Sequence, residues 1–90
     1  MDTLIKIYQT RFVVNVTDDT GHRSLITLRG PVYSSLNNAK NSDEFVNDWM
    51  IEHQEWEVHK VHLCIFESYL DHKDETLVYQ DSDYLLYCKY

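Results

Sequence analysis

The chain has 90 residues, 43% of them hydrophobic, and a net charge of −7 at pH 7. This length fits a single domain (residues 1–90) with a thin core, and the three Gly and Pro residues argue against disorder. Residues 1–41 hold five Lys or Arg and three Asp or Glu (+2), whereas residues 42–90 hold three and twelve (−9). This uneven distribution suggests a negative electrostatic field on one side of the molecule. A negative field repels nucleic acid and attracts basic surfaces, so direct nucleic-acid binding is not expected.

The first predicted element is a strand over residues 3–17, which is rich in β-branched side chains. Its apolar residues occupy odd positions first and even positions afterwards, namely Ile5 and Ile7, then Phe12, Val14 and Val16. Because side chains alternate between the faces of a sheet, these two groups would point in opposite directions. A bulge near residues 9–11 would reconcile them, and so would a covered second face.

A second strand is predicted over residues 22–29, after a turn at residues 18–21. The two strands would form an antiparallel hairpin. Gly30-Pro31 is expected to end the second strand, because proline is excluded from central strands. Residues 32–40 indicate a loop or a short helical turn, and a single helix over residues 34–54 is the alternative.

The clearest helical period lies in residues 41–57. Asn41 or Ser42 is expected to cap this helix, and Glu44, three residues after Asn41, resembles the second half of a capping box. When the residues are placed around a helix at about 100° per residue, the apolar ones fall in one broad sector, as expected for a helix that packs on a sheet. That sector contains Phe45, Val46, Trp49, Met50 and His53.

The same helix carries a row of acidic side chains. Glu44, Asp48 and Glu52 stand four residues apart on one line, where like charges repel, and Glu52 is near the negative end of the helix dipole. Residues 41–57 contain six acidic residues and no Lys or Arg. Their average spacing is about 3.7 Å of helical rise, close to the spacing of about 3.4 Å between phosphates along one DNA strand. The row is either a surface for a positively charged partner or a solvated face.

Beyond the helix, residues 56–69 indicate a central strand with apolar side chains on both faces. Two more strands are predicted over residues 76–80 and 84–90, after turns at residues 71–74 and 81–83. The expected fold is therefore α+β: a mainly antiparallel sheet of about five strands with one amphipathic helix packed across it, in the order ββαβββ.

No residue pattern indicates catalysis or metal binding, so we expect a non-enzymatic protein without metal or cofactor. His59 and His62 would point to opposite faces of a strand, and no glycine-rich phosphate loop is present. Cys64 and Cys88 fall in predicted strands and are expected to be buried and reduced, although neighbouring strands would permit a bridge. Without a signal peptide or a long apolar stretch, the expected location is the cytoplasm.

In its short length, acidity, richness in Tyr and Asn and lack of a catalytic motif, the chain is similar to small phage-encoded inhibitors, the anti-restriction and anti-CRISPR proteins. The resemblance is one of composition and assigns no role to an individual residue. It implies an inhibitor that acts by binding another protein.

The leading hypothesis is a binding protein that mimics nucleic-acid charge and occupies a basic, nucleic-acid-binding groove of a protein partner. The alternative is a protein-interaction module or homo-oligomer, such as a homodimer, joined through a sheet edge and aromatic residues, with incidental acidity. The predicted partner-binding residues are Glu44, Asp48, Glu52, Glu55, Glu57, Asp71, Asp74, Glu75, Asp81 and Asp83.

Overall fold

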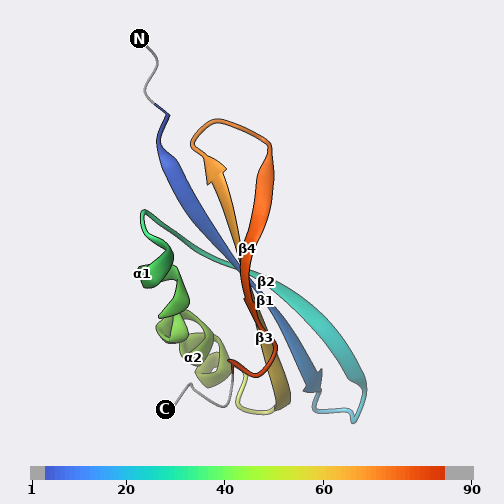
Figure 1. Ribbon diagram of the computed structural model, residues 1–90. Helices are drawn as coiled ribbons and strands as arrows, with labels where there is room; N and C mark the ends of the chain where they lie inside the picture. Colours follow the sequence, from blue (N-terminus) through green and yellow to red (C-terminus); the bar gives the residue numbers. More distant parts are fainter. Residues whose placement is uncertain (1–3, 85–90) are drawn as a thin grey trace.

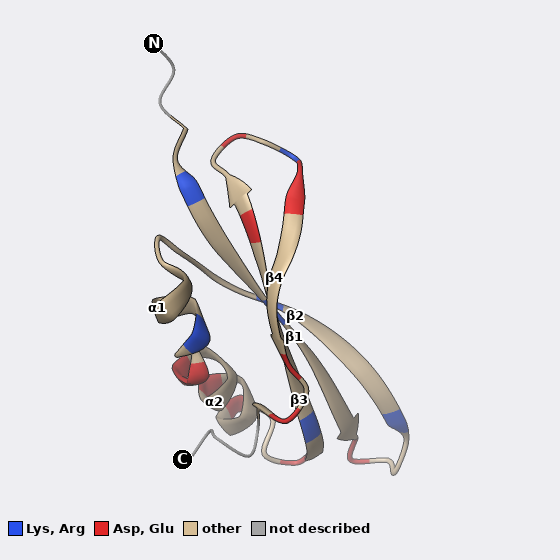
Figure 2. Ribbon diagram, viewed as in Figure 1, with Lys and Arg blue, Asp and Glu red and all other residues tan. Residues whose placement is uncertain are grey.

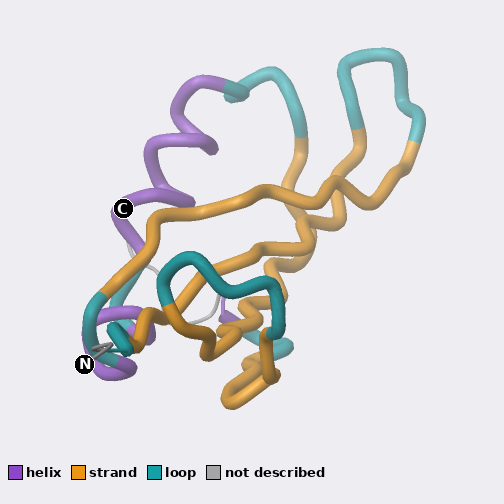
Figure 3. The backbone as a smooth tube through the Cα atoms, turned by 90° about the horizontal axis from the view of Figure 1, so that it is seen from above, coloured by secondary structure: helices purple, strands orange, loops and turns teal. Residues whose placement is uncertain are grey.

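The computed structural model describes residues 4–84, which form an antiparallel sheet with two helices on one of its faces (Figures 1 and 3). The strand order β2-β1-β3-β4 places β1 and β3 at the centre. The α+β class and the antiparallel sheet are thus confirmed. In chain order the elements are β1 (Lys6–Thr17), β2 (Arg23–Tyr33), α1 (Leu36–Lys40), α2 (Asp43–Glu52), β3 (Glu57–Tyr69) and β4 (Glu75–Asp81).

The core lies between the helices and one face of the two central strands. Across the β1–β3 ladder, Phe12 lies opposite Leu63 and Val14 opposite Val61, and all four side chains are fully buried. Burial at every second position is what a pleated strand produces when only one of its faces is covered. The remaining buried apolar residues are Val16, Ala39, Val46, Met50, Ile65 and Tyr84.

The isoleucines at the start of the chain do not join this core. The register between β1 and β3 runs without a shift from Lys6 to Asn15, so odd and even residues of β1 keep opposite faces throughout. Ile7 therefore points away from the face that holds Phe12, and Ile5 is 52% exposed. Of the two alternatives, a bulge in β1 that would turn both groups to one face is therefore wrong.

The irregularity predicted near residues 9–11 is present, but the extra residue belongs to β2. Gln9 lies opposite Val32 and Arg11 opposite Arg29, so two residues of β2 face a single residue of β1. This arrangement is a β-bulge, which bends the strand that carries the extra residue.

The second strand does not end at Gly30-Pro31, as predicted, but continues to Tyr33. Proline is tolerated here because β2 is an edge strand and Pro31 sits in the bulge, where the ladder is already interrupted. The carbonyl of Pro31 accepts a hydrogen bond from Oγ1 of Thr10 at 2.8 Å, which ties the bulge to the neighbouring strand.

Gly30→Ala is expected to lower the free energy of unfolding by about 1–3 kcal/mol, the usual cost of overpacking. A Cβ at this position would collide with Oγ1 of Thr10 and lie 2.8 Å from the ring of Phe12. Urea denaturation followed by tryptophan fluorescence measures the loss.

The matched control is Gly21→Ala, because no atom of the described residues lies within 4 Å of a Cβ at Gly21. Its cost comes only from the backbone φ of 87° and should be about 1 kcal/mol. A Gly30 variant no less stable than the Gly21 variant would contradict the close approach of β2 to Phe12.

The predicted helix, α2, packs on the sheet, and the short α1 precedes it as the helical turn predicted over residues 32–40. The two helices separate at the predicted break near Asn41. The Asn41 side-chain amide donates to the carbonyl of Asn37 at 2.9 Å, and Oγ of Ser42 donates to the carbonyl of Ala39 at 2.8 Å. Both polar side chains therefore close the end of α1, and neither caps α2. The single helix over residues 34–54 and the capping box were wrong for this reason.

The described sheet has four strands and not the five predicted. The expected fifth strand, residues 84–90, lies outside the described residues except for Tyr84, which is not in a strand. After β4 the chain turns at Asp81–Asp83, and the backbone N–H of Asp83 donates to the Asp81 carboxylate at 3.0 Å. The turn carries Tyr84 into the core, where its ring centroid lies 5.9 Å from that of Phe12 and its hydroxyl donates to the carbonyl of Lys40 at 3.3 Å.

Candidate functional site on helix α2

Helix α2 presents one side to the core and the other to solvent. Val46 and Met50 are buried, and the ring of Phe45 stacks on that of Phe12 with centroids 5.5 Å apart. The apolar face predicted for this helix is therefore confirmed. Its burial fixes the direction of the opposite face, which points away from the sheet (Figure 1).

The outward side of α2 carries the acidic row, defined as Glu44, Asp48 and Glu52. All three residues are exposed, and none takes part in an ion pair between residues 4 and 84. Figure 2 marks the acidic positions of α2 in red on the ribbon. Lys40 is the one Lys or Arg between residues 30 and 59, and its ammonium lies over the ring of Tyr79, 4.6 Å from the centroid. Within the described chain, the charge of the row is therefore uncompensated.

The negative charge at the start of α2 also acts on Tyr33 at the end of β2. Burial raises the pKa of the Tyr33 hydroxyl, and the carboxylates of Glu44 and Asp43 raise it further, because a second negative charge nearby is unfavourable. Within residues 4–84, no cation lowers the pKa of Tyr33. The field of α2 thus extends beyond the helix itself.

The C-terminal end of α2 is stabilised by aromatic stacking and has no basic residue in its last turn. The imidazole of His53 stacks on Trp49 at a centroid distance of 4.4 Å and lies 5.1 Å from the ring of Trp56. Its Nδ1 is 2.8 Å from the carbonyl oxygen of Trp49. This packing ends the helix at Glu52, so that Glu55 lies in the following turn and stays exposed.

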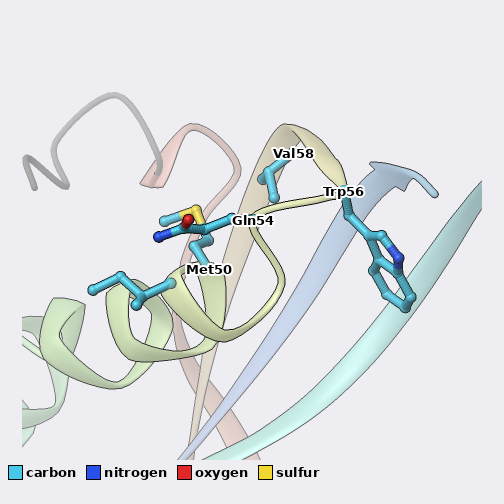
Figure 4. A pocket seen from close by; sticks show the side chains of 5 residues that line it. Met50, Gln54, Trp56 and Val58 are labelled. Carbon is cyan, nitrogen blue, oxygen red and sulfur yellow. The ribbon is translucent and has the colours of Figure 1, made fainter. Parts of the chain in front are cut away.

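A hollow of about 340 Å³ lies where α2 meets the start of β3 (Figure 4). Met50 and Gln54 project from the end of the helix and the turn after it toward Val58 of β3, whereas the indole of Trp56 points away. The fifth lining residue, Ile51, is 55% exposed although it is apolar. The hollow thus has a mixed polar and apolar wall, and Ile51 connects it to the exposed side of α2.

Sequence reasoning missed this hollow and the exposure of Ile51. The exposure of Ile51 could have been predicted from the helical period. Ile51 is seven residues after Glu44 and therefore lies about 20° from it around the helix. An isoleucine in that sector falls on the solvent side, outside the apolar face. The depth of the hollow depends on the angle between α2 and β3, which the period does not determine.

The acidic residues around the β3–β4 turn are distant from α2 along the sheet (Figure 2). Asp71 and Asp74 are exposed in the turn, and Glu75 begins β4. An oxygen of Glu75 lies 2.6 Å from Nη2 of Arg11, and the Arg11 guanidinium covers the ring of Phe66 at 4.4 Å. Glu75 therefore has an internal partner that links β4 to β1.

The remaining predicted acids also have local partners. Asp81 accepts the hydrogen bond of the turn after β4, and Asp83 lies 3.9 Å from Nζ of Lys60. Glu57 is exposed at the start of β3, 4.0 Å from Nδ1 of His59. Of the ten predicted residues, the structure groups the acidic row and Glu55 and distributes the other six along the sheet.

Cys64 and His62 lie on the face of β3 that the helices leave uncovered. Sγ of Cys64 is 3.7 Å from Nε2 of His62, and burial raises the pKa of the thiol, which disfavours the nucleophilic thiolate. Cys88 lies outside the described residues. Between residues 4 and 84, no three His, Cys, Asp or Glu side chains are placed to hold one metal ion.

Comparison of the chain with protein-family models, with curated proteins and with solved structures finds no match. Neither of the two helices described has the length and apolar character that a membrane crossing requires. A function for this chain must therefore be inferred from the geometry and charge of α2.

Proposed function

We propose that this protein is a non-enzymatic binding protein whose acidic row occupies a basic, nucleic-acid-binding surface of a protein partner. One observation carries this proposal: Glu44, Asp48 and Glu52 are exposed on the outward side of α2, and within residues 4–84 no cation pairs with them. The three carboxylates span about 12 Å along one line of the helix. The spacing of about 6 Å is wider than the value of about 3.7 Å predicted for six acids on one helix, because α2 ends at Glu52 and Glu55 and Glu57 lie outside it. What the row offers a partner that binds phosphates is a line of exposed negative charge.

Stability alone does not account for the row. Each pair of like charges four residues apart costs about 0.2–0.5 kcal/mol, and Glu52 near the C-terminal end of α2 opposes the helix dipole. A lysine at position 48 would turn both repulsive pairs into attractive ones. Retention of three acids is expected if the exposed side of the helix serves binding.

The finer proposal is an inhibitor of the phage anti-restriction or anti-CRISPR kind, which blocks its target by charge mimicry. Its support is the composition of the chain together with the acidic row. In such a role the carboxylates displace water from the basic groove of the target, and electrostatic attraction accelerates association.

Capture from a bacterial lysate on the immobilised protein tests the proposal. The retained protein should be a basic nucleic-acid-binding protein that is released by a double-stranded DNA oligonucleotide, because both ligands would occupy one surface. Its affinity should fall steeply between about 50 and 200 mM salt. A partner that DNA does not displace, or whose affinity is unchanged by salt, would refute charge mimicry.

A second candidate function is self-association through β4. This strand forms one edge of the described sheet, and Leu77 and Val78 are 44% and 38% exposed on it. Exposed edge strands are sites of pairing between chains. Size-exclusion chromatography at increasing protein concentration distinguishes the two functions, because a dimer insensitive to salt favours β4.

A further inference from the structure

We infer that the partner carries a large apolar side chain, of the size of leucine, that enters the hollow beside the acidic row. The inference rests on the proposed function and adds the chemistry of the partner. It specifies a protein segment in which lysines or arginines flank one apolar residue. A partner surface with positive charge alone would leave the hollow unused.

The position of Ile51 supports this reading. Around the helix Ile51 lies about 20° from Glu44 and about 60° from Asp48, so it belongs to the same exposed sector as the acidic row. It is 55% exposed and forms part of the wall of the hollow. A partner that contacts the row would therefore cover Ile51 as well and remove its apolar surface from water.

The size and lining of the hollow suit a side chain. Its volume of about 340 Å³ leaves room for an inserted leucine side chain together with part of the residues that flank it. Met50, Ile51 and Val58 provide apolar contacts, and Gln54 adds a polar amide to the lining. Interfaces are typically anchored by one such apolar or aromatic group in a pocket within a polar rim.

The acidic residues in the segment that lines the hollow favour a basic occupant over a second copy of this chain. The exposed acids Glu52, Glu55 and Glu57 alternate along the sequence with the residues that line the hollow. A second copy carries a net charge of −7 and would be repelled by them. Lysines or arginines on both sides of an inserted apolar residue would instead meet these carboxylates.

Two fluorescein-labelled oligolysine peptides of equal charge test the inference by fluorescence anisotropy. One carries a single central leucine and the other an alanine at the same place. The leucine peptide is expected to bind the full chain about tenfold more tightly, because part of its larger apolar surface leaves water. In the Gln54→Trp variant, in which an indole fills the hollow, the ratio should fall to about one, with the affinity of the alanine peptide unchanged.

Gln80→Trp is the matched control, since Gln80 is also exposed but lies on β4. This variant should keep the preference for leucine. Equal binding of both peptides to the wild-type chain, or a preference for leucine that survives Gln54→Trp, would refute the binding of an apolar side chain in the hollow. Neither result would contradict binding through the acidic row. Failure of both peptides to bind at low salt would overturn the proposed function itself.

Discussion

Reversing two charges of the acidic row, Asp48→Lys together with Glu52→Lys, is expected to lower the affinity for the captured partner about 100-fold. Both side chains are exposed and have no internal cation within residues 4–84, so their replacement removes no contact that holds the fold. The new charges would face the basic surface of the partner and repel it. Isothermal titration or surface plasmon resonance at fixed salt measures the change.

The same variant should be slightly more stable than the wild type. A lysine at position 48 would pair with Glu44, four residues before it, and a cation at position 52 would complement the helix dipole, which together add about 0.5–1 kcal/mol to the free energy of unfolding. A loss of binding that accompanies a gain in stability cannot result from misfolding. Urea denaturation supplies the second measurement.

Asp19→Lys with Asp74→Lys is the matched control, because it changes the net charge by the same amount at two exposed turn residues outside α2. This variant should lose far less affinity, through long-range attraction only. Equal losses in the two double variants would show that net charge and not the acidic row determines binding.

The central strands and the position of α2 could be predicted from the sequence because their periods are strong. Residues 56–69 were expected as a strand, and β3 spans Glu57–Tyr69. The apolar sector of residues 45–53 likewise predicted which side of α2 packs on the sheet. Both features depend on the residues of a single element, which a periodic pattern describes well.

The features that could not be predicted depend on contacts between distant residues. Pro31 would end a central strand, and its tolerance follows from the edge position of β2, which only the strand order reveals. Ser42 was predicted as a cap for α2, but its hydroxyl donates a hydrogen bond to the carbonyl of Ala39 instead. Likewise, the pairing of Glu75 with Arg11 joins residues 64 apart, and it separates a structural acid from the acidic row.

Phe12→Ala is expected to lower the free energy of unfolding by about 3–5 kcal/mol, a large part of the 5–15 kcal/mol typical for a domain. Phe12 is fully buried in β1, and its ring contacts Phe45 of α2 and Tyr84 at centroid distances of 5.5 and 5.9 Å. Its removal would open a cavity where the helix, the central strand and the end of the described chain meet. Circular dichroism and urea denaturation report the loss.

Phe66→Ala is the matched control, because it removes the same side chain from β3 on the face without helices. The ring of Phe66 is only half-buried and is covered by the Arg11 guanidinium at 4.4 Å. Its replacement should cost about 1–2 kcal/mol, since part of the ring is already in contact with water. If the two variants lost equal stability, the core would not be confined to the helix-covered face. The outward direction of the acidic row, which depends on where α2 packs, would then lose its structural basis.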